Sequence, residues 1–401
     1  TPTELSEGRH SLAATTVGNY ALFGGGSGFT PSYKDTVDAY DTSLTRTTPT
    51  ELIVGRYGLA ATTVGGYALF GGGSGSSSSY KDTVDAYDTS LTRTTPTELS
   101  VGRRYLAATT VGNYALFGGG VSGSYSSTVD AYGTSLTRTI PTGLITAREH
   151  LAATTVGNYA LFGGGFGSSA SYKDTVDAYD TSLARSTPTS LSFARTGLSA
   201  TTIGNYALFG GGYNDDTSPY ETSIVDAYDT SLARTTPTGL SVARGYLAST
   251  TIGNYALFGG GNIETPSSNK DTVDAYDTSL TRTIPTSLSV ARYSLAATTI
   301  SNYALFGGGR GSSPIFKDTV DAYDDNLTRS QKTELSKERY ELSSVTLGNY
   351  ALFAGGYGES HETTVDVYKY EPNKCFPIAF SWKFLPEIFS LADSSIFLFI
   401  I

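Results

Sequence analysis

The sequence repeats one pattern eight times, and this repetition limits what the chain can fold into more than any other feature. Its clearest mark is a glycine triplet. Seven copies of the triplet begin at Gly24, Gly71, Gly118, Gly163, Gly210, Gly259 and Gly307, and the eighth copy reads Ala354-Gly355-Gly356. Successive copies lie 47, 47, 45, 47, 49, 48 and 47 residues apart. Periods of roughly 45 to 50 residues are typical of radial or solenoid arrays of small units.

Each unit contains four short segments with the character of β-strands. In the first unit, residues 12–17 and 20–23 are rich in small, β-branched and aromatic side chains, and Gly18-Asn19 between them suits a tight hairpin turn. Residues 36–40 alternate in polarity, as expected for a strand whose two faces meet different neighbours. Residues 44–48 form the fourth segment, which ends at Pro49 because proline cannot donate to a strand ladder.

These segments predict an all-β fold. The repeats contain no apolar residues at helical spacing with capping residues, so we expect no helix in them. Four strands make one antiparallel blade, and eight blades arranged around an axis make a β-propeller. The first segment begins with the small residues Ala13, Ala14 and Thr15, which favour an innermost position where strands crowd together.

The units resemble the kelch repeat. The shared features are an arginine before the first strand, a second strand that ends in Gly-Gly, and a Val-Asp-Ala-Tyr-Asp strand followed by a turn. The arginines are Arg9, Arg56, Arg103, Arg148, Arg195, Arg244, Arg292 and Arg339. The resemblance covers residues 1 to about 372 and implies a kelch-like propeller of eight four-stranded blades. The units depart from the family in lacking its tryptophan in the fourth strand, which bears on the packing between blades.

The repeat pattern stops near Lys374, so we divide the chain into a propeller domain at 1–372 and an atypical hydrophobic tail at 373–401. The tail has three interpretations: it supplies a strand to the last blade, it belongs to something outside the ring, or it is an aberrant end. Its longest uncharged run is Ser394 to Ile401, far shorter than the roughly 20 residues of a membrane-spanning helix. The sequence lacks methionine, so we expect it to be part of a longer translation product. Thr1 aligns with Thr48, so we expect the chain to begin inside a fourth strand.

Charge argues against nucleic acid as a partner. Charged residues are 16% of the chain and the net charge is −10, whereas nucleic-acid affinity depends on clustered Lys and Arg. Eight arginines precede the first strands and seven lie in the fourth strands. We expect them to bond to carbonyl groups or to the repeated carboxylates of the Asp38 type between blades. The alternative is a ring of guanidinium groups at a channel mouth that binds an anion.

The residues of common catalytic sites are scarce. The three histidines, His10, His150 and His361, have no metal-ligand spacing, and the single cysteine, Cys375, allows no disulfide within the chain. Gly24 to Gly28 is glycine-rich but lacks the Lys-Ser/Thr of a phosphate-binding loop. We therefore predict no catalytic residue, no metal site and no cofactor.

The informative signal is where the units differ. The turns after the first and third strands scarcely change, as Gly18-Asn19 and Asp41-Thr42-Ser43 illustrate. Three positions vary, and we call them the first, second and third variable positions: the two residues after the repeat arginine and the residue after the glycine triplet. Their candidate binding residues are His10, Tyr57, Arg104, Tyr105, Glu149, His150, Phe166, Tyr213, Tyr246, Asn262, Tyr293, Arg310, Tyr340 and Tyr357.

In an antiparallel blade, the connection into the first strand and the connection from the second to the third emerge at the same end, so these positions share one face. Variable loops on a fixed scaffold are typical of a recognition surface, and Tyr and Arg are enriched in contact surfaces. The simpler alternative is drift at unconstrained positions. The sequence thus predicts a non-catalytic module that binds a protein or glycan, and kelch propellers commonly carry partner contacts on the same loops.

Two rival functions stay open. One is a sugar-active enzyme of the kelch-like oxidase or mutarotase type, and the other is a purely structural repeat. The near-identical units are similar to those of bacterial and phage surface proteins, which implies adhesion at an extracellular surface. Oligomeric state and cell compartment do not follow from the sequence.

Overall fold

The computed structural model describes residues 2–29, 33–75, 79–169, 171–216, 220–264 and 267–370. The chain separates into a compact unit, Thr1–Tyr370, and a second segment, Glu371–Ile401. The tail and its three interpretations lie outside the described residues. The described residues contain no helix, which confirms the all-β prediction, and none of their elements is a helix that could cross a membrane.

Each repeat contributes one antiparallel sheet, with its strands in sequence order. The first strands are β1 (Ala13–Val17), β5 (Ala60–Val64), β9 (Ala107–Val111), β14 (Ala152–Val156), β20 (Ser199–Ile203), β24 (Ala248–Ile252), β31 (Ala296–Ile300) and β36 (Ser343–Leu347). The second strands are β2 (Tyr20–Gly24), β6 (Tyr67–Gly71), β10 (Tyr114–Gly118), β15 (Tyr159–Gly163), β21 (Tyr206–Gly210), β25 (Tyr255–Gly259), β32 (Tyr303–Gly307) and β37 (Tyr350–Ala354).

The third strands are β3 (Val37–Asp41), β7 (Val84–Asp88), β11 (Val129–Gly133), β18 (Val176–Asp180), β22 (Val225–Asp229), β28 (Val273–Asp277), β34 (Val320–Asp324) and β38 (Val365–Lys369). The fourth strands are β4 (Arg46–Thr47), β8 (Arg93–Thr94), β12 (Arg138–Thr139), β19 (Arg185–Ser186), β23 (Arg234–Thr235), β29 (Arg282–Thr283) and β35 (Arg329–Gln331). Among the described residues, these strands form seven four-stranded sheets and the three-stranded sheet β36-β37-β38, and shorter strand pairs lie in the loops between them.

The fourth strand is shorter than the sequence indicated. Residues 44–48 were expected to be extended, yet β4 contains only Arg46 and Thr47. The cause is a side-chain turn, because the Asp41 carboxylate accepts hydrogen bonds from the backbone N–H groups of Ser43 and Thr45 at 2.9 Å. This turn holds Leu44 at a φ of 64°, outside the strand region.

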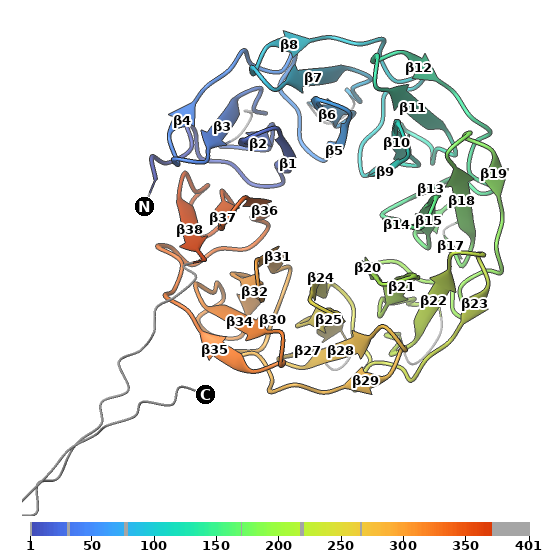
Figure 1. Ribbon diagram of the computed structural model, residues 1–401, viewed down its shortest axis with the longest axis vertical. Coiled ribbons are helices and arrows are strands. Elements are labelled where there is room, and N and C mark those ends of the chain that lie inside the picture. Colours follow the sequence, from blue (N-terminus) through green and yellow to red (C-terminus); the bar gives the residue numbers. More distant parts are fainter. Residues whose placement is uncertain are drawn as a thin grey trace, which may run out of the picture. The chain divides into compact units, whose positions relative to one another are not determined.

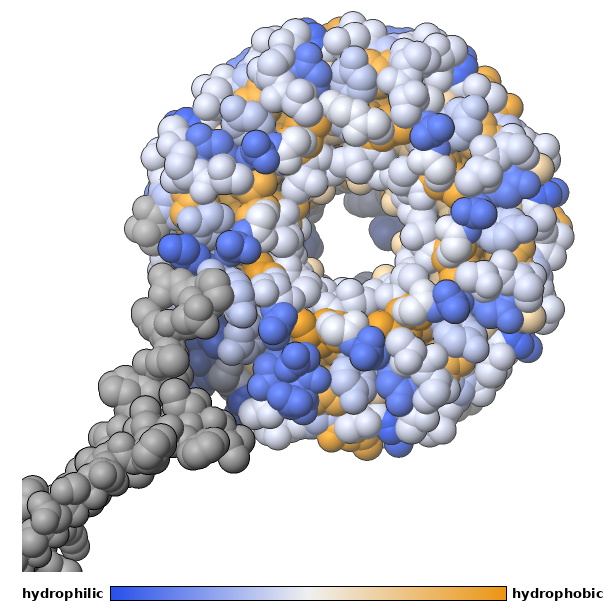
Figure 2. All heavy atoms as spheres, viewed as in Figure 1, coloured by the Kyte–Doolittle hydropathy of each residue, from blue (hydrophilic) through white to orange (hydrophobic). Residues whose placement is uncertain are grey.

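The sheets follow one another around a central opening, in a β-propeller-like repeat arrangement (Figure 1). The first strands are innermost, as predicted, and the space-filling view shows that side chains leave the opening unfilled (Figure 2). Each first strand lies beside the first strands of its neighbours, and β36 lies beside β1. Threonines join neighbouring first strands: Thr110 Oγ1 lies 2.9 Å from Thr62 Oγ1 and donates to the Thr63 carbonyl at 2.7 Å.

Apolar cores form between adjacent sheets. In one of them, Leu161 and Val176 of the fourth unit pack with Phe209 and Tyr228 of the fifth. The Phe209 ring lies directly on Gly163, where an added Cβ would be 2.8 Å from the ring. The last and first units pack in the same way, except that Ala354 stands at the glycine position. Glycine in the triplet therefore lets a phenylalanine of the next sheet approach the backbone.

The repeat arginines are completely buried and hold each sheet together internally. Arg9 Nη2 lies 2.6 Å from Asp38 Oδ2 and donates to the Phe23 carbonyl at 3.2 Å. All eight units contain this pair, with distances from 2.6 to 2.8 Å. The arginines therefore bond to carbonyls and to Asp38-type carboxylates, as expected, but the expectation that these bonds lie between blades is wrong, because each arginine and its aspartate belong to the same unit. The alternative of an anion-binding ring of these arginines is also wrong, because they are 0% exposed.

Candidate functional site

The first and third variable positions pair with each other in every unit. A β-bridge or short strand pair joins His10 to Ser27, Tyr57 to Ser74, Arg104 to Val121, Glu149 to Phe166, Thr196 to Tyr213, Gly245 to Asn262, Tyr293 to Arg310 and Tyr340 to Tyr357. Two of these pairs are regular enough to count as strands: β13 (Arg148–Glu149) with β16 (Phe166–Gly167), and β30 (Arg292–Tyr293) with β33 (Arg310–Gly311). The structure thus brings together the variable positions that the sequence singled out.

The glycine triplet makes this pairing possible. Gly25 and Gly26 have φ values of 68° and 112°, which only glycine adopts without strain. A Cβ at Gly25 would lie 2.7 Å from the Arg56 carbonyl oxygen, and one at Gly26 would lie 2.8 Å from that of His10. The chain therefore turns sharply after the second strand, so that the third variable position reaches back to the first.

The structure adds a fourth variable position, which the sequence analysis missed. It is the residue before the repeat lysine or its equivalent, and it pairs with the third variable position in all eight units. Its members are Tyr33, Tyr80, Tyr125, Tyr172, Glu221, Asn269, Phe316 and His361. Two further strand pairs occur in this region: β17 (Ser171–Tyr172), which joins β16, and β26 (Asn262–Glu264) with β27 (Ser267–Asn269). The constant spacing to the lysine was the available signal.

We call the surface formed by the four variable positions the variable face. The constant turns pack on one another at the other ends of the strands. For example, the Thr89 side chain of the second unit would lie 3.0 Å from a Cβ at Gly18 of the first. The variable and constant ends of the sheets are therefore separate surfaces.

Aromatic side chains from neighbouring units contact one another along the variable face. Tyr105 stacks on His150 with ring centroids 4.4 Å apart, and the Tyr246 hydroxyl donates to the Tyr213 hydroxyl at 2.6 Å. The Phe316 and Tyr340 rings also stack, at 5.7 Å. Such half-buried, mutually supported rings present large amphipathic surfaces with little freedom to lose on binding.

The backbone is left-handed at the second variable position throughout. Gly58 and Gly197 occupy it in two units, but Ser11, Tyr105, His150, Tyr246, Ser294 and Glu341 adopt φ values of 50° to 55° in the other six. A side chain in this region costs about 1–2 kcal/mol relative to glycine. Six of the eight units therefore carry a strained side chain at this position, although Gly58 and Gly197 show that glycine can occupy it.

This strain gives a testable stability difference. We expect Tyr105→Gly to be more stable than Tyr105→Ala by about 1 kcal/mol, because both remove the ring but only glycine relieves the left-handed backbone. Urea unfolding of the two variants measures the difference. Equal midpoints, or a more stable alanine variant, would contradict the strain.

His10, Ser11 and Glu341 form a polar cluster between the first and last units. His10 Nδ1 lies 2.9 Å from Ser11 Oγ and 3.0 Å from Glu341 Oε2, and Ser11 Oγ also donates to Glu341 Oε2 at 2.8 Å. The hydrogen bond from His10 holds the pKa of Glu341 below its usual range. Ser11 and Glu341 both contact Nδ1 of His10. In a proton-relaying triad the serine and the carboxylate contact the two different ring nitrogens, so this cluster does not have the arrangement of a triad.

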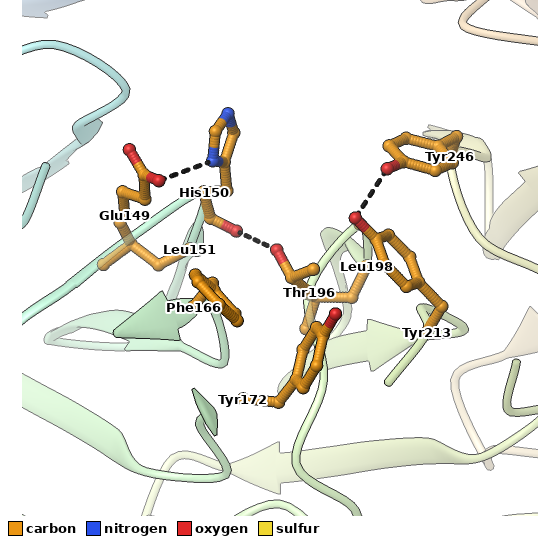
Figure 3. Close-up of a pocket in the computed structure, with 10 residues that line it drawn as sticks. Glu149, His150, Leu151, Phe166, Tyr172, Thr196, Leu198, Tyr213 and Tyr246 are labelled. Carbon is orange, nitrogen blue, oxygen red and sulfur yellow. Dashed lines mark hydrogen bonds and ion pairs between the residues drawn. The ribbon is translucent and has the colours of Figure 1, made fainter. Parts of the chain in front are cut away.

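Two cavities open among the variable positions. One, of about 720 Å³, is lined by this cluster together with Tyr33, Tyr57, Tyr105 and His150. The other, of about 530 Å³, lies between the fourth, fifth and sixth units and is shown in Figure 3. Its walls include Glu149, Phe166, Tyr172, Thr196, Tyr213 and Tyr246. Both volumes fall within the usual range of small-ligand sites, roughly 300–1,000 Å³.

Within the described ranges, no cluster of three or more His, Cys, Asp or Glu side chains could hold a metal ion.

Comparison with protein-family models found no match, and comparison with curated proteins found none either.

Proposed function

We propose that this chain is a kelch-like β-propeller of eight blades that recognises a protein or glycan ligand through the variable face, without catalysing a reaction. One observation carries the proposal: the positions at which the units differ pair with one another in every unit, while the constant turns pack together elsewhere. Loops that vary on an invariant scaffold are the usual carriers of recognition.

Contacts between the first and the eighth unit support the eight-bladed arrangement. Leu5 donates its N–H to the Thr363 carbonyl at 2.7 Å, as Leu52 does to the Asp35 carbonyl within the repeats. The Ser343 hydroxyl donates to the Leu12 carbonyl at 2.7 Å. The backbone hydrogen bond of Leu5 is thus the one that recurs between consecutive units, and it supports the proposal that the first unit is the neighbour of the eighth.

The side chains of the variable face support binding over catalysis. Tyr246 is 37% exposed, and the other tyrosines at the first three variable positions are partly exposed. The cluster of His10, Ser11 and Glu341 has the wrong connectivity for a relay. An adhesive role at an extracellular surface is part of the proposal and rests on the likeness of the repeats to those of surface proteins.

A binding experiment tests the proposal with matched variants. Protein and glycan arrays are probed with wild type, with Tyr105→Gly/Tyr246→Gly, and with Asn158→Gly. Each replacement has a precedent in this chain, at Gly58 and Gly197 for the tyrosines and at Gly66 for the constant turn. We expect the double variant to lose at least about tenfold in affinity for the ligands of wild type, because buried aromatic anchors dominate contact energies.

The constant-turn variant, Asn158→Gly, should bind as wild type does. Full binding by a folded double variant would reject the variable face as the ligand site and leave the structural role. Turnover of a bound sugar would favour the enzyme instead.

A further inference from the structure

Arg104, at the first variable position of the third unit, fills a space between three tyrosines. Its guanidinium carbon lies 4.7 Å from the ring centroid of Tyr105 and 5.7 Å from those of Tyr57 and Tyr80. Arg104 Nη1 also donates to the Tyr57 hydroxyl. Arg310 lies in a similar way over Tyr340, at 5.7 Å. The aromatic clusters of the variable face thus accept guanidinium groups from the chain itself.

The equivalent space in the fifth unit lies within the cavity shown in Figure 3. Thr196 corresponds to Arg104, since each directly follows a repeat arginine and pairs with the third variable position. Glu149 and Tyr172 correspond to Tyr57 and Tyr80. Threonine is shorter than arginine, and Gly197 stands in the place of Tyr105, so the long side chains of Arg104 and Tyr105 have no counterpart at these positions of the fifth unit. Glu149 replaces the ring of Tyr57 by a carboxylate, and only the ring of Tyr80 is retained, as Tyr172. The Tyr213 ring lies beside Gly197.

Glu149 is poorly compensated for its burial. Its side chain is only 16% exposed, and Oε1 lies 3.7 Å from Nδ1 of His150, whose side chain is half exposed. Oε2 is buried and has no hydrogen-bond partner in the described part of the chain. A buried carboxylate gains most from a cationic donor, and a guanidinium group offers two N–H groups in a planar fork that matches it.

The remaining walls of this cavity favour a cation as well. The rings of Phe166, Tyr172, Tyr213 and Tyr246 follow one another at interplanar angles of 66°, 65° and 35°, so they curve around the space. Of the described residues, those that line it include no lysine or arginine. Burial, the hydrogen bond with Tyr213 and the nearby carboxylates of Glu264 and Asp215 all raise the pKa of Tyr246, in keeping with a negative potential there.

We infer that this cavity receives the guanidinium group of an arginine side chain presented by a partner protein. The inference rests on the proposed function and narrows its ligand from a protein or glycan to a protein. The arginine would occupy the place that Arg104 occupies two units earlier, with its planar group against the aromatic wall and its N–H groups toward Glu149. Arginine fits better than lysine because the guanidinium groups of Arg104 and Arg310 already lie over tyrosine rings in the related clusters.

Calorimetric titration with Nα-acetyl-arginine N-methylamide tests the inference, and the citrulline analogue serves as the uncharged isostere. We expect saturable one-site binding of the arginine compound, and binding of the citrulline compound weaker by at least about tenfold. Glu149→Gln should weaken arginine binding by a similar factor. Thr196→Arg should abolish it, because the new side chain fills the site from within. Asn158→Gly, in a constant turn, should leave it unchanged.

Equal affinity for the two compounds, or arginine binding that survives both Glu149→Gln and Thr196→Arg, would overturn the inference. Glu149→Gln replaces one carboxylate oxygen by an amide nitrogen and keeps the shape of the side chain. It therefore tests the inference even if Thr196→Arg fails to fold. The array experiment separates this inference from the proposed function. If a glycan or protein binds through the tyrosines of the variable face but the arginine compound does not bind, only the inference is rejected. If the arginine compound binds but no ligand on the arrays does, only the broader function is rejected.

Discussion

Replacing Arg148 by methionine is expected to lower the free energy of unfolding by about 3–5 kcal/mol. The replacement keeps most of the apolar length but leaves the carboxylate of Asp177, which is completely buried, without its 2.8 Å partner. The remaining contacts of Asp177 are a long ion pair with Arg185 at 3.5 Å and a hydrogen bond from the Ile145 N–H at 2.9 Å, which compensate its charge only in part. The midpoint of urea unfolding, followed by circular dichroism, measures the loss.

Two further variants identify the cause. Arg185→Met should cost only about 1 kcal/mol, because Arg185 is partly exposed and its ion pair with Asp177 is long. The double variant Arg148→Met/Asp177→Leu should recover at least half of the loss, since it removes both buried charges. A double variant as unstable as Arg148→Met alone would show that packing of the arginine, rather than the unpaired charge, is responsible.

The second large effect concerns the packing between sheets. Phe209→Ala should lower the free energy of unfolding by about 3–5 kcal/mol, because it empties the space where the ring lies on Gly163 and against Tyr228. Urea unfolding again provides the measurement.

Gly163→Ala gives the complementary test. Alone, it should destabilise the protein, since the added Cβ would lie 2.8 Å from the Phe209 ring. Combined with Phe209→Ala, the new methyl group enters the vacated space, so the double variant should be less destabilised than the sum of the two single variants. Strict additivity would mean that these residues do not share one contact.

The sheets could be predicted from sequence because each strand has its own local signature and the signature recurs. Val37 to Tyr40 alternate with the period of a strand, and Gly18 supplies the positive φ that the hairpin needs. The start of the fourth strand was misplaced because it depends on a single side chain. The Asp41 carboxylate accepts hydrogen bonds from the backbone of Ser43 and Thr45 and so forms a turn, and the alternation of polar and apolar residues does not predict this turn.

The candidate site was predictable only in outline. Comparing units located three variable positions, but the fourth was hidden by loops of unequal length, since Tyr125 and Phe316 lie at different distances from their glycine triplets. The missing hydrogen-bond partner of Glu149 could not be predicted for another reason. Whether its carboxylate has a partner depends on Thr196 and Tyr172, which come from other loops, and the sequence does not show that a cavity lies beside the threonine.

The buried ion pairs carry a consequence for how such a chain can change its length. Arg9 and Asp38 belong to one repeat, 29 residues apart, and the other pairs also lie within single repeats. If a gene segment that encodes a whole repeat were duplicated or deleted, each repeat would still contain both the arginine and the aspartate of its buried ion pair. No buried charge would lose its partner, so the number of repeats can change in evolution without leaving an unpaired charge in the interior.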